Sequence, residues 1–157
     1  MRFSKKSEYA LRALLELTNS YDRKVVTRVE LSNSLQIPAG FLEGILLTLK
    51  HAGIVASRRG IDGGFKLLKP PSSITLGQII RVLDGPLAPI ACVSQMAYQK
   101  CLNCPYSVKE VCPIQNVMLE VRNAIAGILD HYSLEDFART ASTPLPKKRR
   151  QRKGIGP

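Results

Sequence analysis

The sequence predicts a mainly α-helical protein with one small β-hairpin and a long C-terminal helix. Apolar residues recur at three- and four-residue spacing through most of the chain, which is typical of amphipathic helices. Two short β-prone segments flank a glycine-rich loop at 58–64, and a heptad repeat runs from Ile114 to Tyr132. The chain has 157 residues, enough for one hydrophobic core and an oligomerisation element.

The first two helices are indicated by an apolar stripe and by a capping signal. The first is expected over residues 4–20, with a stripe formed by Ala10, Ala13, Leu14 and Leu17. Thr27 and Glu30 fit a capping box, in which each side chain binds the other residue's backbone amide. A helix of about two turns should therefore begin there and end near Leu35.

A third helix is expected after the break at Pro38, because the residue before a proline is pushed out of the α region. Pro38 suits the first position of this helix, and Gly53 can close it as a left-handed cap. Its apolar stripe consists of Leu42, Ile45, Leu46 and Leu49.

Two short strands should follow, over 54–57 and 65–68, joined by the loop 58–64 that carries Arg58 and Arg59. A short helix, a tight turn, a longer helix and a basic hairpin form a winged helix-turn-helix arrangement. The three helices alone would also fit an ordinary small helical core. With the wing attached, a DNA-binding domain over residues 1–84 is favoured, in a chain that is mainly α with a small β-hairpin wing.

A fourth helix is expected from the Thr75 cap to Asp84, and a long one from Pro113 to Tyr132. The long helix has apolar residues spaced 4, 3, 4, 3 and 4, namely Ile114, Met118, Val121, Ile125, Ile128 and Tyr132. This seam fits a homodimer interface, although packing on the chain's own core is the alternative. Residues 113–138 are thus expected to hold a C-terminal dimerisation helix and a short further helix.

All four cysteines lie in one predicted loop, residues 85–112. Eight, two and seven residues separate Cys92, Cys101, Cys104 and Cys112. The surrounding residues are polar, so the loop offers no core for these side chains to fill. Three interpretations remain open: a metal or iron–sulfur site, a redox disulfide pair, or buried structural thiols.

The charge balance indicates a polyanionic partner. The net charge is +11, but six basic residues between Lys147 and Lys153, in the tail 139–157, contribute to it, leaving about five for the rest. That region is low in apolar residues and is expected to be disordered. The chain starts without an apolar leader and has no run long enough to cross a membrane, so we expect a cytoplasmic protein with reduced thiols and no membrane partner.

Five segments of the chain together resemble one family. They are Ser7–Ala13, Phe41–Glu43, Arg59–Phe65, Ile74–Gly77 and Leu83–Pro89 running into Cys92. Over roughly residues 1–138 the sequence resembles the bacterial winged-helix regulators of the IscR/NsrR/RirA/CymR type. The resemblance implies a homodimeric, sequence-specific transcription regulator, in a family where many members hold an iron–sulfur cluster, [2Fe–2S] or [4Fe–4S], before the dimer helix.

The resemblance also implies cluster ligands. Cys92 occupies the family's first cluster position, Cys112 the third, and Cys104 fits the second best. Cys101 is an additional thiol that could complete an all-thiolate set. Relatives take a fourth ligand from a histidine three residues after the last cysteine, which is Gln115 here, or from an acidic residue early in the partner's first helix, which leaves Glu8 open.

For DNA recognition, Glu43 matches an acidic residue that in relatives can accept a hydrogen bond from cytosine, and Arg59 matches the wing arginine. Pro38, Ala39 and Gly40 stand where relatives often have polar groups, so direct base contacts from that turn should be few. Further contacts to phosphates are expected from Lys50, Arg58 and Lys66.

The expected function is therefore a repressor that binds a pseudo-palindromic DNA operator as a homodimer, with its affinity controlled by a cluster. Alternatives are a zinc-stabilised adaptor and a cluster-free regulator switched by thiol chemistry or a protein partner. An enzyme is not expected, because neither His51 nor His131 lies beside an obvious nucleophile.

Overall fold

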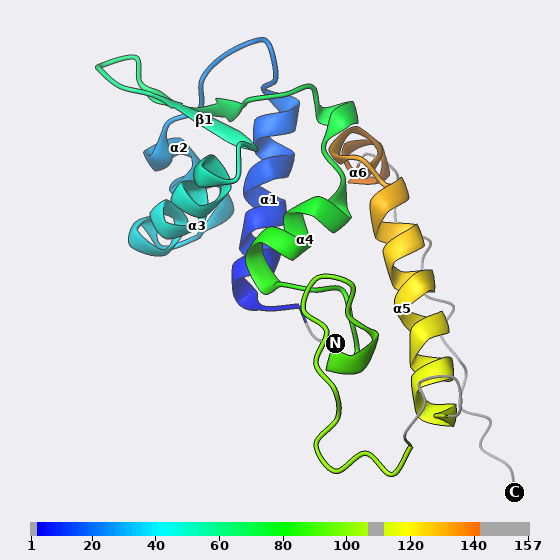
Figure 1. Ribbon diagram of the computed structural model, residues 1–157. Helices are drawn as coiled ribbons and strands as arrows, with labels where there is room; N and C mark the ends of the chain where they lie inside the picture. Colours follow the sequence, from blue (N-terminus) through cyan, green and yellow to red (C-terminus); the bar gives the residue numbers. More distant parts are fainter. Residues whose placement is uncertain (1–2, 107–111, 142–157) are drawn as a thin grey trace, which may run out of the picture.

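The computed structural model describes residues 3–106 and 112–141 and is mainly helical with a two-stranded antiparallel hairpin, as predicted. Figure 1 shows the helices and the hairpin in chain order. The elements are α1 Lys5–Asn19, α2 Arg28–Leu35, α3 Ala39–His51, β1 Val55–Arg58, β2 Gly64–Leu67, η1 Pro71–Ser73, α4 Leu76–Asp84, η2 Ala91–Val93, α5 Pro113–His131 and α6 Leu134–Ala141.

The helix boundaries follow the capping residues that the sequence indicates. Thr27 and Glu30 form the reciprocal capping box of α2, and Gly53 has a positive φ of 69° just after α3. Pro38 is the N-cap of α3 with extended backbone rather than its first helical residue, so that expectation is corrected by one position. The hydroxyl of Ser4 caps α1 by accepting from Ser7 N–H.

The wing is shifted by one residue toward its tip relative to the sequence prediction. Its ladder pairs Val55 with Leu67 and Arg58 with Gly64. Ile54 stays outside β1, because its amide donates to the Leu49 carbonyl at 3.0 Å and closes the end of α3. Val26 forms an isolated antiparallel bridge to Phe65 with N···O distances of 3.0 and 2.8 Å, which fixes the base of the wing to the segment before α2.

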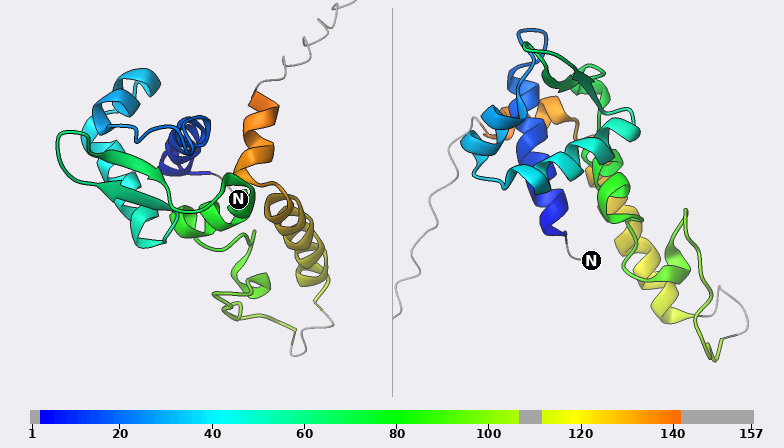
Figure 2. Two further views of the ribbon diagram at one scale, coloured as in Figure 1. Left: turned by 90° about the horizontal axis from the view of Figure 1, so that it is seen from above. Right: turned by 90° about the vertical axis from the view of Figure 1, so that its left-hand side faces the viewer.

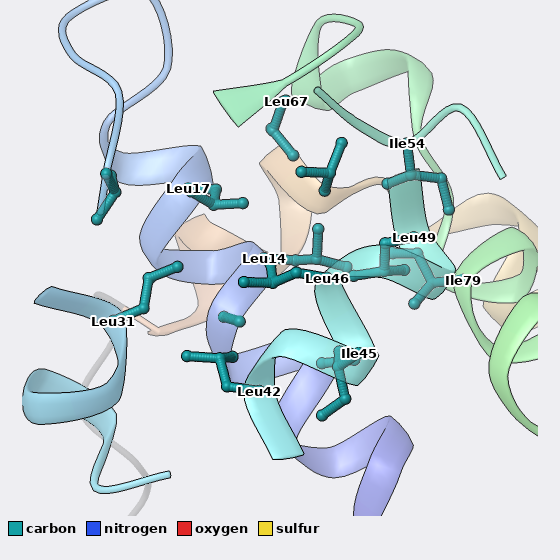
Figure 3. Packing of buried hydrophobic residues seen from close by; sticks show 14 of the residues in the cluster. Leu14, Leu17, Leu31, Leu42, Ile45, Leu46, Leu49, Ile54, Leu67 and Ile79 are labelled. Atoms are coloured by element: carbon teal, nitrogen blue, oxygen red, sulfur yellow. The ribbon is translucent and has the colours of Figure 1, made fainter. Parts of the chain in front are cut away.

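One hydrophobic core holds the helices α1 to α4 and the hairpin together. Leucine and isoleucine side chains from α1 and α3 meet those of the hairpin base and α4, as Figure 3 shows for Leu14, Leu46, Ile54 and Ile79. Leu134 of α6 is completely buried in the same cluster. The C-terminal part of the chain therefore returns to complete the core that the N-terminal part begins.

The end of α5 nearest α6 is fastened to the start of α4. Leu76 N–H donates to the Tyr132 carbonyl at 2.9 Å, and Leu134 N–H donates to the Ile74 carbonyl at 2.8 Å. The guanidinium of Arg81 binds both carboxylate oxygens of Asp130, at 2.5 and 2.8 Å. Figure 2 shows α5 extending from this junction along the loop that carries the cysteines.

In the described part of the chain, no helix is both long and apolar enough to span a membrane. The basic segment expected to be disordered lies largely outside the described residues.

Candidate DNA-binding surface and cysteine site

The residues expected to contact DNA lie on one side of the molecule. In Figures 1 and 2, α2, α3 and the hairpin gather on one side of α1, whereas α5 lies on the other. The first turn of α3 begins with Pro38, Ala39 and Gly40, and all three are exposed. This turn can approach a nucleic acid closely, but it presents main chain and a methyl group rather than polar side chains.

Glu43 is exposed on α3 and forms an ion pair with Arg28 of α2. This role of Arg28 was not predicted from the sequence, because the two residues are 15 positions apart and only the turn between α2 and α3 brings them together. The carboxylate that is expected to read a base is thus held by a neighbouring cation in the absence of DNA.

The wing presents further positive charge. Arg58, Arg59 and Lys66 are exposed on the hairpin, and Lys50 is exposed in the last turn of α3. At the tip, Ile61 is fully exposed, which is unusual for a large apolar side chain and was not singled out from the sequence. Gly63 is needed in this turn, because a Cβ there would lie 2.6 Å from the Arg58 carbonyl oxygen.

The four cysteines are free thiols in different environments. Cys92 lies in the short helix η2 and is buried, Cys104 and Cys112 are half-buried, and Cys101 is exposed. The burial of Cys92 corrects the expectation that the loop offers no apolar surroundings, because Val93 beside it and Leu87 are also buried. The polar description holds for the part of the loop around Cys101.

The thiols gather around Cys101. Its pKa is raised chiefly by a hydrogen bond with Cys92, then by desolvation and by the nearby charges of Cys92 and Cys112, while a hydrogen bond with Cys104 acts in the opposite direction. Among residues 3–106 and 112–141, however, no set of three or more His, Cys, Asp or Glu side chains forms a ready metal-binding group. The cysteines are therefore neighbours in a loop without already forming a closed ligand set.

Gln115 connects this loop to α5. Its side-chain amide donates to the Cys92 carbonyl at 2.9 Å, and its main-chain N–H donates to the Cys112 sulfur at 3.4 Å. Cys112 is thereby the N-cap of α5. One residue in the first turn of α5 thus holds both the first and the last cysteine of the loop.

Glu8, the other candidate ligand, is on the surface of α1. It pairs with Lys5 at 2.6 Å and with Arg12, and its pKa is lowered principally by the hydrogen bond from Lys5. Within one chain, Glu8 is thus engaged by two cations of its own helix rather than by the cysteine loop.

The residues of the predicted dimer seam on α5 fall into an exposed group and a half-buried group. Ile114, Val121, Ile128 and Tyr132 are exposed, whereas Met118 and Ile125 are half-buried against their own chain. Val117, which the heptad reading left out, is 55% exposed and continues the exposed line between Ile114 and Val121. No residue of α5 is fully buried in the single chain, which leaves an apolar surface without a cover.

A helix-turn-helix followed by a basic hairpin wing defines the class of winged-helix transcription regulators. The sequence matches the Rrf2 family, described as "Iron-dependent Transcriptional regulator", over residues 3–140. The chain belongs to the Rrf2 family, in agreement with the resemblance found in its motifs.

Individual relatives support this assignment. The chain is 40% identical over 147 residues to an rrf2-like HTH-type transcriptional regulator of Rhodobacter capsulatus, covering 92% of this chain and 96% of the relative. The structure of CymR, the global cysteine regulator of B. subtilis, is similar with a TM-score of 0.72 and 28% identity, over 89% of this chain and 98% of CymR. The structure of T. potens IscR is similar with a TM-score of 0.68 and 26% identity, over 90% of this chain and 88% of IscR. These relatives are transcription regulators rather than enzymes, as expected.

Proposed function

We propose that this chain is a homodimeric repressor that binds a pseudo-palindromic DNA operator, and that an iron–sulfur cluster in the cysteine loop controls its affinity. The observation that carries the proposal is that all four cysteines lie in one loop, whose first and last cysteines Gln115 fastens to α5. The family's description as iron-dependent regulators supports the same conclusion.

On the DNA side, the first turn of α3 enters the major groove and the wing reaches the adjacent minor groove. Glu43 accepts from a cytosine amino group once Arg28 has moved to a phosphate, and Arg59 enters the minor groove. Lys50, Arg58 and Lys66 contact phosphates and contribute affinity rather than sequence preference. Ile61 at the wing tip adds an apolar contact to the groove floor.

On the cysteine side, Cys92, Cys104 and Cys112 supply three ligands. The fourth is either Cys101 or Glu8 of the partner subunit. The donor chemistry fits, because thiolates are the usual ligands of [2Fe–2S] and [4Fe–4S] clusters. The raised pKa of Cys101 also fits, because thiols that gather without a cation disfavour each other's ionisation, and a bound cation reverses this effect.

When bound, a cluster would supply a cross-link of the loop that is sensitive to iron, oxygen or nitric oxide. Residues of the chain would transmit the presence or absence of this cross-link to the DNA-binding elements. Cys112 caps α5 and Gln115 fixes Cys92 to it, while the Arg81–Asp130 pair joins the other end of α5 to α4. A small rotation of α5 at the dimer seam would misplace two recognition helices that must lie about 34 Å apart, one DNA turn.

The test is anaerobic purification of the full chain with a visible absorption spectrum and iron and sulfide analysis. Wild type should be coloured and should bleach in air. Cys101→Ala and Glu8→Ala are compared with Lys100→Ala, beside Cys101 in the loop, and with Glu16→Ala, which makes the same truncation as Glu8→Ala on the same helix. Whichever variant alone loses iron identifies the fourth ligand. DNA affinity, measured by fluorescence anisotropy on a sequence selected from a random pool, should differ between holo and apo protein.

A colourless protein without iron and sulfide would overturn the cluster proposal while leaving the DNA-binding proposal intact. Thiol redox control is then the second candidate, because Cys101 is exposed and Cys92 is near enough to raise its pKa. Hydrogen peroxide would oxidise the two thiols to one disulfide, and two molecules of water would be formed as the two thiol hydrogens are lost. Mass spectrometry would detect this loss of two hydrogens, and bound zinc would instead indicate a structural site.

A further inference from the structure

A cavity of about 470 Å³ lies between α4, the segment 86–96 and α5. We propose that this cavity binds a small organic carboxylate through Arg122. Its walls include both apolar and polar side chains from the three elements, among them Val82, Leu87, Met96, Ala126, Gln78 and Arg122. Mixed apolar and polar walls are typical of small-molecule sites.

Arg122 is the feature that points to an anion. Its Nε is buried and has no hydrogen-bond acceptor among the described residues. The other cation of the cavity, Arg81, is already neutralised by its bidentate pair with Asp130. The cavity therefore holds one guanidinium whose charge is not balanced by a neighbouring carboxylate in the part of the chain that is described. The two Nη nitrogens of a guanidinium can donate to both oxygens of a carboxylate in one plane.

The position of Arg122 separates this site from the dimer seam. At about 100° per residue, Arg122 is turned away from Val121 of the exposed stripe, and Ala126 and Asp130 continue along its own side of α5. That side faces α4 and the segment 86–96 of the same chain. A second copy that covered the exposed stripe would leave the cavity accessible.

The cavity also touches the cysteine loop. Arg122 lines a second cavity of about 310 Å³, whose wall includes Cys92 and Gln115. A ligand held by Arg122 would therefore join the segment after Cys92 to α5, at the place where the loop and the helix meet. Its effect on the loop would be independent of whether the thiols carry a cluster.

The size and the walls define the ligand class. The volume lies in the lower part of the range for small-molecule sites. The guanidinium selects an anionic head group, and Val82, Leu87 and Met96 select a short aliphatic body. The structure thus assigns the site to a short-chain carboxylate rather than to a bare inorganic anion.

The test is calorimetric titration and thermal unfolding of the full-length apo dimer with butanoate. Butanamide is the neutral counterpart, inorganic phosphate is the bare anion, and sodium chloride matches the ionic strength. Titration to about 20 mM exceeds the millimolar dissociation constant expected of so small a ligand. Wild type should bind butanoate saturably and butanamide at least tenfold more weakly.

Arg122→Gln should weaken butanoate binding at least tenfold, whereas Arg139→Gln on α6 should bind as wild type does. Circular dichroism and sedimentation check that both variants remain folded dimers. No saturable binding of butanoate, equal binding by Arg122→Gln, or binding of phosphate alone would each overturn the proposal. Because neither iron nor DNA is present in this experiment, its failure would leave the proposed operator binding and cluster control unaffected.

Discussion

The side-chain amide of Gln115 donates a 2.9 Å hydrogen bond to the main-chain carbonyl of Cys92. The same residue donates its main-chain N–H to Cys112 Sγ at 3.4 Å. The first and last cysteines of the loop are therefore held by one residue in the first turn of α5. In this structure Gln115 works as a positioning residue, at the place where relatives can have a histidine ligand.

Gln115→Glu should loosen the loop around Cys92. Glutamate has nearly the same shape, but its carboxylate cannot donate to the carbonyl and would repel it. Loss of one hydrogen bond of this kind costs about 0.5–1.5 kcal/mol. Because Cys92 is buried, its alkylation by iodoacetamide, followed by mass spectrometry, should become several-fold faster.

Gln99→Glu is the matched control for this change, since it places the same charge on an exposed residue of the same loop. Its Cys92 should react at the wild-type rate. An unchanged alkylation rate in Gln115→Glu would show that the hydrogen bond does not hold the loop.

Arg28→Ala should weaken DNA binding through Glu43. The Arg28–Glu43 pair is about half exposed on both sides, so its contribution to stability should be below about 1 kcal/mol. Without Arg28, however, an unpaired carboxylate would face the DNA phosphates and repel them. We expect a several-fold lower affinity in fluorescence anisotropy, with little change in the unfolding midpoint.

The double variant Arg28→Ala, Glu43→Gln separates this effect from the loss of a direct phosphate contact by Arg28. If Arg28 acts by compensating Glu43, the double variant should bind more tightly than Arg28→Ala alone. Equal affinities of the two would mean that Arg28 contributes only its own charge.

Val121→Glu should convert the dimer into a folded monomer. Val121 lies in the middle of the exposed stripe of α5, where an added carboxylate would be buried against the second copy. Asn123→Glu adds the same charge two residues further on, about 200° around the helix and outside the stripe. Analytical ultracentrifugation should show a monomer for the first variant and a dimer for the second. A dimeric Val121→Glu would contradict the assignment of this face.

The local signals of the sequence predicted most of the fold. The Thr27–Glu30 capping box, the break at Pro38 and the left-handed Gly53 each act within a few residues, so the sequence alone places α2 and α3 within one residue. The wing shifted by one residue because Ile54 is used to close α3, which depends on the geometry of the preceding helix end.

The features that the sequence did not reveal depend on contacts between distant segments. Leu134 is part of the hydrophobic core only because α6 folds back on α1. Arg28 contacts Glu43 only because the turn between α2 and α3 brings the two helices together. The heptad spacing correctly found an apolar side of α5, but Met118 and Ile125 could be assigned to their own chain only once the loop and α4 were placed beside them.

Gly77 and Asp130 should be coupled energetically at the junction of α4 and α5. Asp130 Oδ1 lies where a side chain of residue 77 would begin, because a Cβ on Gly77 would be only 2.0 Å from it. The pKa of Asp130 is lowered, first by its hydrogen bond with Arg81 and also by the charge of that guanidinium. Asp130→Asn should cost about 0.5–1 kcal/mol at pH 7, the range for partly exposed ion pairs.

The pH dependence of this cost follows from the direction of the pKa shift. A carboxyl group whose pKa is lower in the folded state stabilises the fold fully above its unfolded value of about 3.9. The stabilisation is then lost as the pH falls through the folded pKa. Chemical denaturation should therefore show a constant difference between wild type and Asp130→Asn from pH 6 to 8, and a shrinking one below about pH 4.

Gly77→Ala provides the second side of a double-mutant cycle. Alanine must displace the carboxylate from Arg81, but it also favours the helix by up to about 1 kcal/mol, so the stability of this single variant does not reveal the coupling. The cycle does, because Asp130→Asn should cost almost nothing once Gly77→Ala has already separated the pair. Asp130→Asn could instead lower the free energy of unfolding equally in wild type and in Gly77→Ala. The close approach at Gly77 would then not hold the Arg81–Asp130 pair, and α5 would be joined to α4 mainly through the backbone hydrogen bonds of Leu76 and Leu134.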